Sequence, residues 1–435
     1  MAIKATRQKE PMGTVANVIS GYAFKSAEFC ESGIPVIKIK NIQLGEVDCT
    51  EMQCVPEKYL SIDSKYHVHK GDILISLTGS HINQPNSVVG RVARYKKEAP
   101  RALLNQRAGK VIIRRPEACD AGFLFYQLFD ESVRRDIAAF AHGAANQANV
   151  SPSQIESLNI QLPPLLVQRK IAAILSVYDD LIDNNLRRIK ILEEMAQNLY
   201  REWFVKFHFP GHQHARFVDS PLGRIPEGWE VATLGAVSTI IPGYAFRSKD
   251  WTDAGIPVIK IKNIRLGNLI DTEQVDHVPE GILSTTHKKY WLYNGDILIA
   301  MTGATAGKIG KLRSKEPVLL NQRVAKIDPK HPFEEFVWCT VSSPGADERF
   351  FALADGAAQP NMSGSQIENF QLLVPSSDLV QQFNDFVSPF IKEVDNMMLR
   401  NQALRRTRDR LLPKLISGEV DVSELDITVP EEVAA

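Results

Sequence analysis

The stretch GYAFKSAEFCESGIPVIKIKNI (residues 21–42) returns as GYAFRSKDWTDAGIPVIKIKNI (residues 243–264), and this repeat decides the fold. Three shorter segments recur in the same order, namely GDILI from Gly71 and Gly295, LLNQR from Leu103 and Leu319, and SQIE from Ser153 and Ser365. A repeat at half the chain length indicates duplication of a whole domain, not a solenoid. The chain therefore holds two related modules in tandem.

The intervals between the shared segments differ between the modules. The largest difference follows the paired Thr-Gly steps, where the interval from Gly79 to Leu103 exceeds that from Gly303 to Leu319 by eight residues (24 against 16). Loops on a rigid frame are where binding specificity is varied. The pattern predicts two copies that do one job on two different targets.

Composition places the chain among globular proteins with ordinary thiols. With 435 residues, 44% of them hydrophobic, it is long enough for two substantial cores. No apolar run reaches membrane-spanning length and no secretory leader is evident, so a cytoplasmic location without membrane contact is expected. The five cysteines are odd in number and have no counterparts between modules, which argues against a disulfide or zinc framework.

The net charge is zero, yet basic residues cluster at the same place in both modules. Between Arg91 and Arg115 the only acid is Glu98, and between Lys308 and Lys326 the only acid is Glu316. We favour phosphate contact over a merely solvated surface, because two unrelated surface runs would rarely be basic at matching positions.

Each module is predicted to be mixed and rich in strands. Alternation of apolar and basic residues in residues 36–40 predicts a half-buried strand, with Ile37 and Ile39 on one face and Lys38 and Lys40 on the other. Residues 121–140 and 333–353 are predicted helices late in each module.

A long helical pattern follows each module, over residues 168–205 and 380–417. Apolar residues recur at a spacing near 3.5, which is typical of a coiled-coil seam, and Gly418 suits a C-terminal cap. We expect the two helices to pack on one another as a spacer of ~58 Å. Asn185 and Asn401 fall on seam positions, where a buried polar pair would fix the register; the alternative is that either faces solvent.

Catalytic and metal-binding patterns are weak. GATAGK at residues 303–308 is one residue short of a phosphate-binding loop and has Ile309 where Ser or Thr is required. The histidine groupings lack carboxylate or cysteine partners and are not duplicated. The repeated features are strands, basic stretches and a spacer, so a binding role is favoured over a catalytic one.

The whole chain resembles the specificity subunit of a type I restriction-modification system. The resemblance is carried by the paired LNQR segments, by the SQIE segments followed by Pro163-Pro164 and Pro375, by LYREWFVKFHFPG from Leu199, and by LLPKLISGEV from Leu411. It implies an α+β fold of two tandem homologous mixed α/β target recognition domains, separated by two long helices packed as an antiparallel coiled coil. The first module lacks a counterpart of Trp229, so its start is less sharply marked. The expected divisions are recognition domain 1 (1–165), central spacer helix (166–209), linker and recognition domain 2 (210–378), distal spacer helix (379–420) and acidic tail (421–435).

The resemblance also implies a non-catalytic role. Each domain would read one half of an asymmetric bipartite target in double-stranded DNA. Two methyltransferase subunits, which use S-adenosylmethionine, would dock on the outer faces of the helices, and restriction subunits that use ATP and Mg would join them. No cofactor or metal is expected on this chain itself. The alternatives are an orphan or decoy DNA-binding protein without a methyltransferase partner, and a self-sufficient enzyme with an unrecognised site.

Residues identical in both modules cannot distinguish two half-sites, so they are assigned to the frame or to phosphate contact. The shared lysines are interpreted either as phosphate contacts or as exposed strand charge. For Gln106, Arg107, Gln322 and Arg323, internal hydrogen bonding is favoured over contact with DNA. Base reading is assigned to the unlike stretches 46–70, 80–102, 268–294 and 304–318, with Arg91 and Arg94 as the best candidates because arginine grips guanine through two hydrogen bonds. The candidate DNA-binding residues are Lys38, Lys40, Arg91, Arg94, Lys96, Lys97, Lys260, Lys262, Lys308, Lys311 and Arg313.

A basic cluster on the distal helix has two interpretations. Its members are Arg400, Arg405, Arg406, Arg408 and Arg410. A solvated helix face is favoured over contact with DNA between the half-sites.

Overall fold

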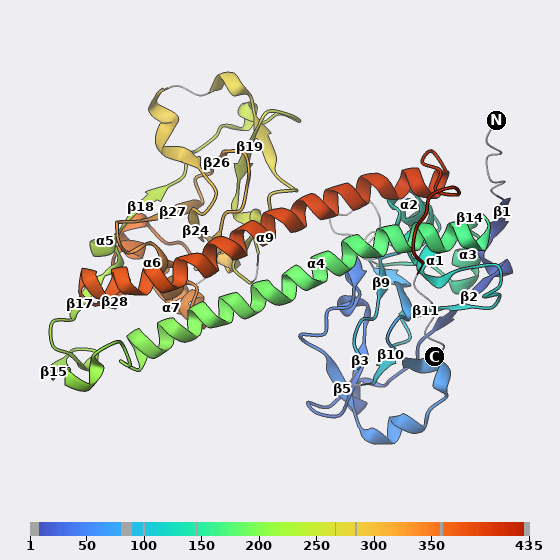
Figure 1. Ribbon diagram of the computed structural model, residues 1–435, viewed down its shortest axis with the longest axis horizontal. Coiled ribbons are helices and arrows are strands. Elements are labelled where there is room, and N and C mark those ends of the chain that lie inside the picture. Colours follow the sequence, from blue (N-terminus) through green and yellow to red (C-terminus); the bar gives the residue numbers. More distant parts are fainter. Residues whose placement is uncertain are drawn as a thin grey trace. The chain divides into compact units, whose positions relative to one another are not determined.

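The computed structural model describes residues 8–79, 89–98, 101–144, 147–265, 267–282, 285–356 and 360–429 (Figure 1). Its contacts divide the chain into two units. The first unit joins Met1–Leu181 to Leu404–Ala435, and the second is Ile182–Ala403.

The first module is built on two sheets. The five-stranded sheet has the order β2 (Ala16–Ser20), β11 (Ala108–Ile113), β7 (Ile73–Ser76), β9 (Val92–Arg94) and β4 (Gly45–Glu46). The four-stranded sheet has the order β5 (Gln53–Val55), β3 (Ile34–Ile37), β10 (Ala102–Leu104) and β6 (His67–Val68). Two smaller sheets pair β1 (Gln8–Pro11) with β14 (Asn159–Leu162), and β12 (His142–Ala144) with β13 (Gln147–Asn149) and β8 (Thr78–Gly79).

The second module repeats the order of the two main sheets and has one further edge strand in the larger sheet. Its larger sheet has the order β18 (Ser238–Pro242), β27 (Val324–Pro329), β24 (Ile297–Ala300), β25 (Ile309–Lys311), β21 (Leu269–Ile270) and β20 (Ile264–Arg265). Its smaller sheet has the order β22 (Asp276–Val278), β19 (Ile256–Ile259), β26 (Val318–Leu320) and β23 (Trp291–Leu292). The remaining pairs are β17 (Glu230–Thr233) with β28 (Gln371–Val374), and β15 (Phe217–Ser220) with β16 (Gly223–Pro226). The predicted duplication is therefore a duplication of sheet order.

The predicted alternating strand is wrong in its extent and its exposure. β3 ends at Ile37, and Ile39–Asn41 form a 3₁₀ turn; β19 and Ile261–Asn263 do the same in the second module. All four residues of β3 are buried, with Ile37 in one apolar cluster and Val36 in another. A strand covered on both faces needs no polar alternation.

Short helices follow the sheets at the predicted places. Residues 121–140 form α1 (Ala121–Phe129) and α2 (Glu131–Ala139), and residues 333–353 contain α6 (Glu334–Val341) and α7 (Ala346–Phe351). α3 (Pro152–Glu156) and α8 (Gly364–Glu368) carry the SQIE repeats, while α5 (Leu234–Val237) precedes β18. Ser151 and Ser363 each form a capping box with the glutamine three residues later, which fixes where the repeat helix begins.

The two long helices are α4 (Leu165–Tyr200), continued by a π-helical turn at Arg201–Val205, and α9 (Ser377–Ser417). Gly418, predicted to cap the second, has a left-handed φ of 78°. Among the described residues no helix is both long and apolar enough to cross a membrane.

Each unit contains a paired stretch of these two helices. In the second unit Asn185 Nδ2 donates to Asn401 Oδ1 at 2.8 Å, and Arg188 lies 3.5 Å from Glu393, so partners descend in α9 as residues ascend in α4. The helices are therefore antiparallel, as expected. Asn401 is 1% exposed and also donates to the Ile182 carbonyl at 3.4 Å, so the buried interpretation of this asparagine is right.

In the first unit the end of α9 and the segment after it complete the core of the first module. Leu412, Leu415 and Ile416 share one apolar cluster with residues of α1 and α4. Lys170 Nζ of α4 donates to the carbonyls of Ser423 and Leu425, both at 2.7 Å. The described part of the expected acidic tail is thus packed against the first module.

Candidate nucleic-acid interface

The lysines of the KIKNI repeat sit on a turn that a buried asparagine holds. Asn41 Oδ1 accepts from the Lys38 N–H at 3.0 Å, and its amide donates to the Asp48 carbonyl at 3.0 Å. Asn263 does the same with Lys260 and Asp271, at 2.9 and 3.0 Å. Both asparagines are buried, so the repeated asparagine is part of the frame, a role the sequence analysis missed.

The surroundings of these lysines differ between the modules. Lys38 Nζ lies 3.4 Å from the Phe29 ring centroid and donates a hydrogen bond to Gln53 Oε1 of β5. The pKa of Lys38 is lowered, mainly by burial and to a smaller extent by the charge of Lys40. Lys40 is exposed. Within the described ranges neither Lys38 nor Lys40 forms a close ion pair, although the charge of Lys40 helps to lower the pKa of Asp48.

In the second module Asp276 of β22 takes the place that Gln53 has in β5. Lys260 and Lys262 lie 2.8 and 2.9 Å from its carboxylate, and Lys260 Nζ is also 3.1 Å from the centroid of the Trp251 ring. The hydrogen bond from Lys260 is the largest cause of the lowered pKa of Asp276. One carboxylate thus offsets part of the charge that the first module presents.

The two arginines favoured for base reading are both partly buried. Arg91 Nη1 donates to Gln43 Oε1 at 3.0 Å, and burial, then the charge of Arg134, lowers its pKa. Arg94 lies with its guanidinium carbon 4.4 Å from the Phe125 ring centroid and is half-buried against α1. Lys96 and Lys97, at the end of the same segment, are exposed. Of these four, the two lysines are the more accessible.

Lys311 and Arg313 are wrongly placed in the candidate interface. Arg313 Nε donates to Asp395 Oδ1 of α9 at 3.0 Å, and Lys311 Nζ lies 3.7 and 3.8 Å from Asp395 and Glu335. The side chain of Arg313 is 6% exposed and that of Lys311 is 8% exposed. Their charges are paired with carboxylates in the interior of the second unit. Lys308, three residues before, is half-buried and has no side-chain partner within the described ranges.

Another part of each basic stretch also serves the interior. Lys110 lies 3.4 Å from Asp72 and donates to the His67 carbonyl at 2.7 Å. Lys326 repeats the pair with Asp296 at 3.0 Å. Burial would lower the pKa of Lys326, but the carboxylates of Asp296 and Asp328 outweigh it and raise that pKa. The shared lysine is therefore an internal ion-pair partner of the aspartate in GDILI.

The Gln-Arg pair of LNQR lies outside, contrary to expectation. Gln106, Arg107, Gln322 and Arg323 are all exposed. In both modules the pair occupies the centre of a turn between two strands of the frame. The residues that flank the pair, namely the two leucines and the alanine or valine, are buried, so only the centre of each turn is exposed.

The unlike stretches carry most of the difference between the modules. Residues 80–88 and 99–100 of the first module and 283–284 of the second lie outside the described residues. In the described part of 46–70, Tyr59 and Tyr66 pack edge-on against Tyr22, with ring centroids 5.9 and 5.5 Å apart. In the second module Tyr244 packs with Tyr290 at 5.4 Å. Aromatic clusters thus anchor the divergent segments on the repeated GYAF tyrosine.

The arginines of the distal helix divide between two environments. Arg408 pairs with Asp179 and lies 4.9 Å from the Phe129 ring centroid, within the first unit. Burial would lower its pKa, but Asp179 outweighs it and raises that pKa. Arg400, Arg406 and Arg410 are exposed and Arg405 is half-buried. The favoured solvated face holds for the exposed three and is wrong for Arg408.

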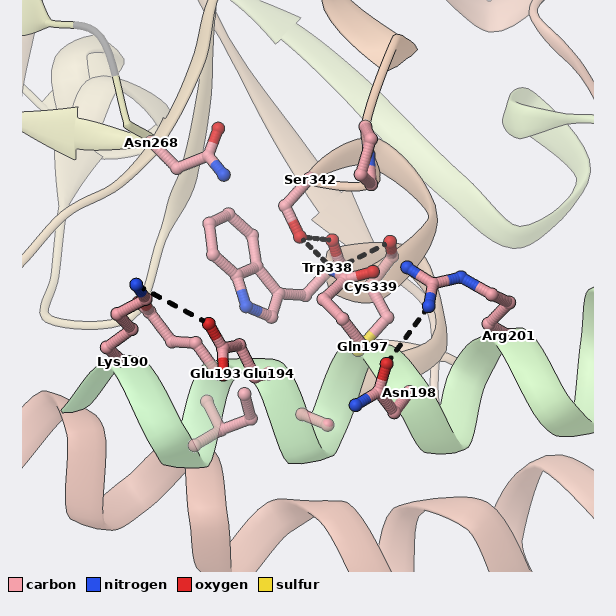
Figure 2. Close-up of a pocket in the computed structure, with 13 residues that line it drawn as sticks. Lys190, Glu193, Glu194, Gln197, Asn198, Arg201, Asn268, Trp338, Cys339 and Ser342 are labelled. Atoms are coloured by element: carbon pink, nitrogen blue, oxygen red, sulfur yellow. Dashed lines mark hydrogen bonds and ion pairs between the residues drawn. The ribbon is translucent and has the colours of Figure 1, made fainter. Parts of the chain in front are cut away.

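A cavity of about 290 Å³ lies in the second unit. Most of its lining residues come from α4 and α6, which face one another there (Figure 2). Gln197 donates to the Ser342 hydroxyl at 2.9 Å and to the Cys339 carbonyl at 3.2 Å, while the Trp338 ring lines the wall. Burial raises the pKa of Glu193, and Arg313 opposes that shift. In the part of the chain that the structure describes, no three acids, histidines or cysteines gather as metal ligands.

Comparison with known proteins gives a consistent result. The model of the family described as "Type I restriction modification DNA specificity domain" matches twice, at residues 8–194 and 226–406. The MjaVIII specificity subunit of the type I restriction enzyme from Methanocaldococcus jannaschii is 25% identical over 436 residues, which cover 98% of this chain and 92% of that protein. The EcoBI specificity subunit of Escherichia coli is 24% identical, with coverage of 94% and 85%.

A solved structure shares the fold. The S subunit of the type I restriction-modification system from M. genitalium aligns with a TM-score of 0.57 and 18% identity, over 96% of this chain and 97% of that chain. Because the two copies of the family model together cover more than half of the sequence, the chain belongs to the family of type I restriction-modification specificity subunits and carries two DNA specificity domains.

Proposed function

We propose that this chain selects the DNA target of a type I restriction-modification complex, with each recognition domain reading one half of an asymmetric bipartite site in double-stranded DNA. The observation that carries the proposal is one sheet topology present twice with unlike segments attached. A repeated frame supplies the same docking geometry, and unlike segments supply different base contacts. Two unlike half-sites follow.

The electrostatic difference between the domains supports unlike half-sites. Lys38 meets the neutral Gln53, whereas Lys260 meets the charged Asp276 at the equivalent strand position. A carboxylate beside the lysines weakens attraction to phosphate and adds an acceptor for base amino groups. The first domain is therefore expected to depend more strongly on phosphate contact than the second.

The long helices are proposed to dock two methyltransferase subunits. Large apolar side chains stand exposed on α4, at Val177 and Leu181 in the first unit and at Ile191 and Met195 in the second. Each pair is four residues apart and so lies on one helix face. Exposed apolar stripes of this kind suit a protein partner.

Catalysis is assigned to the partners. S-adenosylmethionine would be bound by the methyltransferase subunits, and ATP and Mg by the restriction subunits. This chain would contribute position, not reacting groups. A cytoplasmic location follows from work on cellular DNA.

The docking proposal is tested by Ile191→Glu in the full chain. A charge on this exposed apolar contact should lower the amount of methyltransferase that co-purifies, from two subunits toward one, because the charge would have to be desolvated in one of the two interfaces. Lys190→Ala is the matched control, since its surface ion pair with Glu194 at 3.8 Å contributes little. Co-purification of the Ile191→Glu variant at the parental level would contradict the docking face.

The function itself is tested by sequencing DNA with detection of methylated bases. Cells that express this chain with its cognate methyltransferase subunit are compared with cells that lack the chain. The expected result is a new split, asymmetric methyladenine motif. A palindromic motif would contradict unlike half-sites, and an unchanged pattern with the partner present and folded would favour the decoy.

A further inference from the structure

Two identical turns, one in each domain, present a glutamine and an arginine to solvent. Gln106 and Arg107 are the central residues of a β-turn closed by the Ala108 N–H on the Asn105 carbonyl at 2.9 Å. Gln322 and Arg323 occupy the same turn, closed by the Val324 N–H on the Asn321 carbonyl at 3.0 Å. Each turn joins a strand of the smaller sheet to a strand of the larger one.

The same hydrogen bonds hold both turns rigid. The Gln106 N–H donates to the Tyr22 carbonyl at 2.9 Å, and the Arg107 carbonyl accepts from Leu77 at 3.0 Å. In the second domain the Gln322 N–H and the Arg323 carbonyl do the same with Tyr244 and Met301, at 2.9 and 3.0 Å.

The glycine of GYAF allows this arrangement. A Cβ on Gly21 would lie 2.3 Å from the Leu104 carbonyl oxygen, and one on Gly243 would lie 2.1 Å from the Asn321 carbonyl oxygen. No side chain fits between these backbones. The longest repeat in the sequence therefore fixes the position of the turn.

The side chains of the turn have no structural task of their own. Among the described residues, no hydrogen bond or ion pair is formed by the side chains of Gln106, Arg107, Gln322 or Arg323, and all four are exposed. The shared lysines of the two basic stretches behave differently, since Lys110 and Lys326 both pair with partly buried carboxylates. A rigid, duplicated turn that exposes two unpaired donors is built to contact something common to both half-sites.

We propose that Arg107 and Arg323, each assisted by the neighbouring glutamine, contact the phosphate backbone of the two half-sites regardless of base sequence. The inference rests on the proposed function. Identical side chains cannot distinguish unlike half-sites, whereas every duplex offers the same phosphates. The guanidinium binds phosphate through two parallel hydrogen bonds, and the glutamine amide adds a neutral donor. The turn would thereby set the register from which the unlike segments reach the bases.

The test uses the full chain in complex with its methyltransferase subunit. Arg107→Ala, Arg323→Ala and the double variant are titrated by fluorescence anisotropy against a duplex with the methylated motif and against a scrambled duplex, from 50 to 200 mM salt. Each single change should weaken both duplexes alike, on the order of ten-fold. It should also reduce the slope of log affinity against log salt by about 1.

Two further variants separate phosphate contact from other causes. Arg107→Lys retains the charge, so the salt slope should stay at the parental value. Arg135→Ala is the matched control, because this exposed arginine of α2 pairs with Glu131 on the same helix and lies outside the basic stretches; it should change neither affinity nor slope. Thermal unfolding of each variant establishes that it is folded at the assay temperature.

The outcomes distinguish the inference from the proposed function. If the parent complex binds neither duplex, the specificity role fails and the turn has no DNA to contact. If the parent binds but the alanine variants match it in affinity and slope, the phosphate contact is refuted. If a variant weakens only the motif duplex or alters the methylated motif, the arginine reads bases and the inference is also refuted.

Discussion

Replacement of Arg313 tests whether this residue belongs to the DNA interface, as the sequence predicted, or to a buried ion pair, as the structure shows. Its Nε donates to Asp395 Oδ1 at 3.0 Å, and its Nη2 lies 3.8 Å from Glu193. Arg313→Ala removes the nearest cation from a carboxylate that is itself 12% exposed. Breaking a buried ion pair from one side costs about 3–5 kcal/mol.

The structure favours the lower end of that range. Lys311 remains 3.7 Å from Asp395 after the change, so the carboxylate keeps one cation. We expect a loss of about 3 kcal/mol in the free energy of unfolding. The second unit runs from Ile182 to Ala403, and for a unit of that size the midpoint falls by roughly 2–4 °C per kcal/mol, or about 6–12 °C in all.

Tryptophan fluorescence is the natural assay, because all five tryptophans lie in the second unit: Trp203, Trp229, Trp251, Trp291 and Trp338. The thermal midpoint and the urea midpoint of that unit can thus be followed in the intact chain. Lys315→Ala, at an exposed position two residues on, is the matched control and should stay within about 0.5 kcal/mol of the parent. An unchanged midpoint for Arg313→Ala together with weaker DNA binding would refute the internal ion pair and restore Arg313 to the DNA interface.

Three further changes test other parts of the second unit by the same fluorescence assay. Asn401→Ala removes a buried amide from the helix pair and should cost about 1–3 kcal/mol of unfolding free energy; no loss would show that its hydrogen bonds are not formed. Burial raises the pKa of Glu335 above 4.5 in the folded protein. The stability that this carboxyl group contributes is therefore present below about pH 4.5 and is lost as the pH rises through the higher pKa of the folded state. Glu335→Gln should remove that loss in urea titrations at different pH values, and an unaltered pH profile would contradict this prediction. Gly243→Ala forces a Cβ to within 2.1 Å of the Asn321 carbonyl oxygen and should cost about 3 kcal/mol or more, whereas Gly281→Ala, with open space around it, should be nearly neutral; equal effects would argue against the close approach.

The sequence predicted those features that are encoded within a single segment or that occur in both modules. The duplication, the two long helices and the late short helices follow from repeats and from a periodicity that each segment carries by itself. The asparagine pair could be placed because a coiled-coil register is a regular count along the helix.

The sequence did not show which charges are internal. Arg313 and Asp395 are 82 positions apart, so their contact exists only after the second domain has packed on α9. The sequence also did not show that the turn at Gln106 and Arg107 faces solvent. Buried residues flank this turn closely on both sides, so the exposed segment is short. The basic stretches therefore mixed three kinds of residue, namely buried ion-pair partners, half-buried arginines and exposed donors.

The first unit is assembled from both ends of the chain, and this has a consequence for biosynthesis. Its core includes Leu412, Leu415 and Val422, which are translated after the whole of the second unit. The first module therefore waits for residues beyond Ala403 to complete its core, while the second unit, one uninterrupted segment from Ile182 to Ala403, has all its residues earlier. A premature stop just after Ala403 would damage the first module, and a recombination event that exchanged the uninterrupted segment would replace one of the two DNA specificity domains and leave the residues of the first unit unchanged.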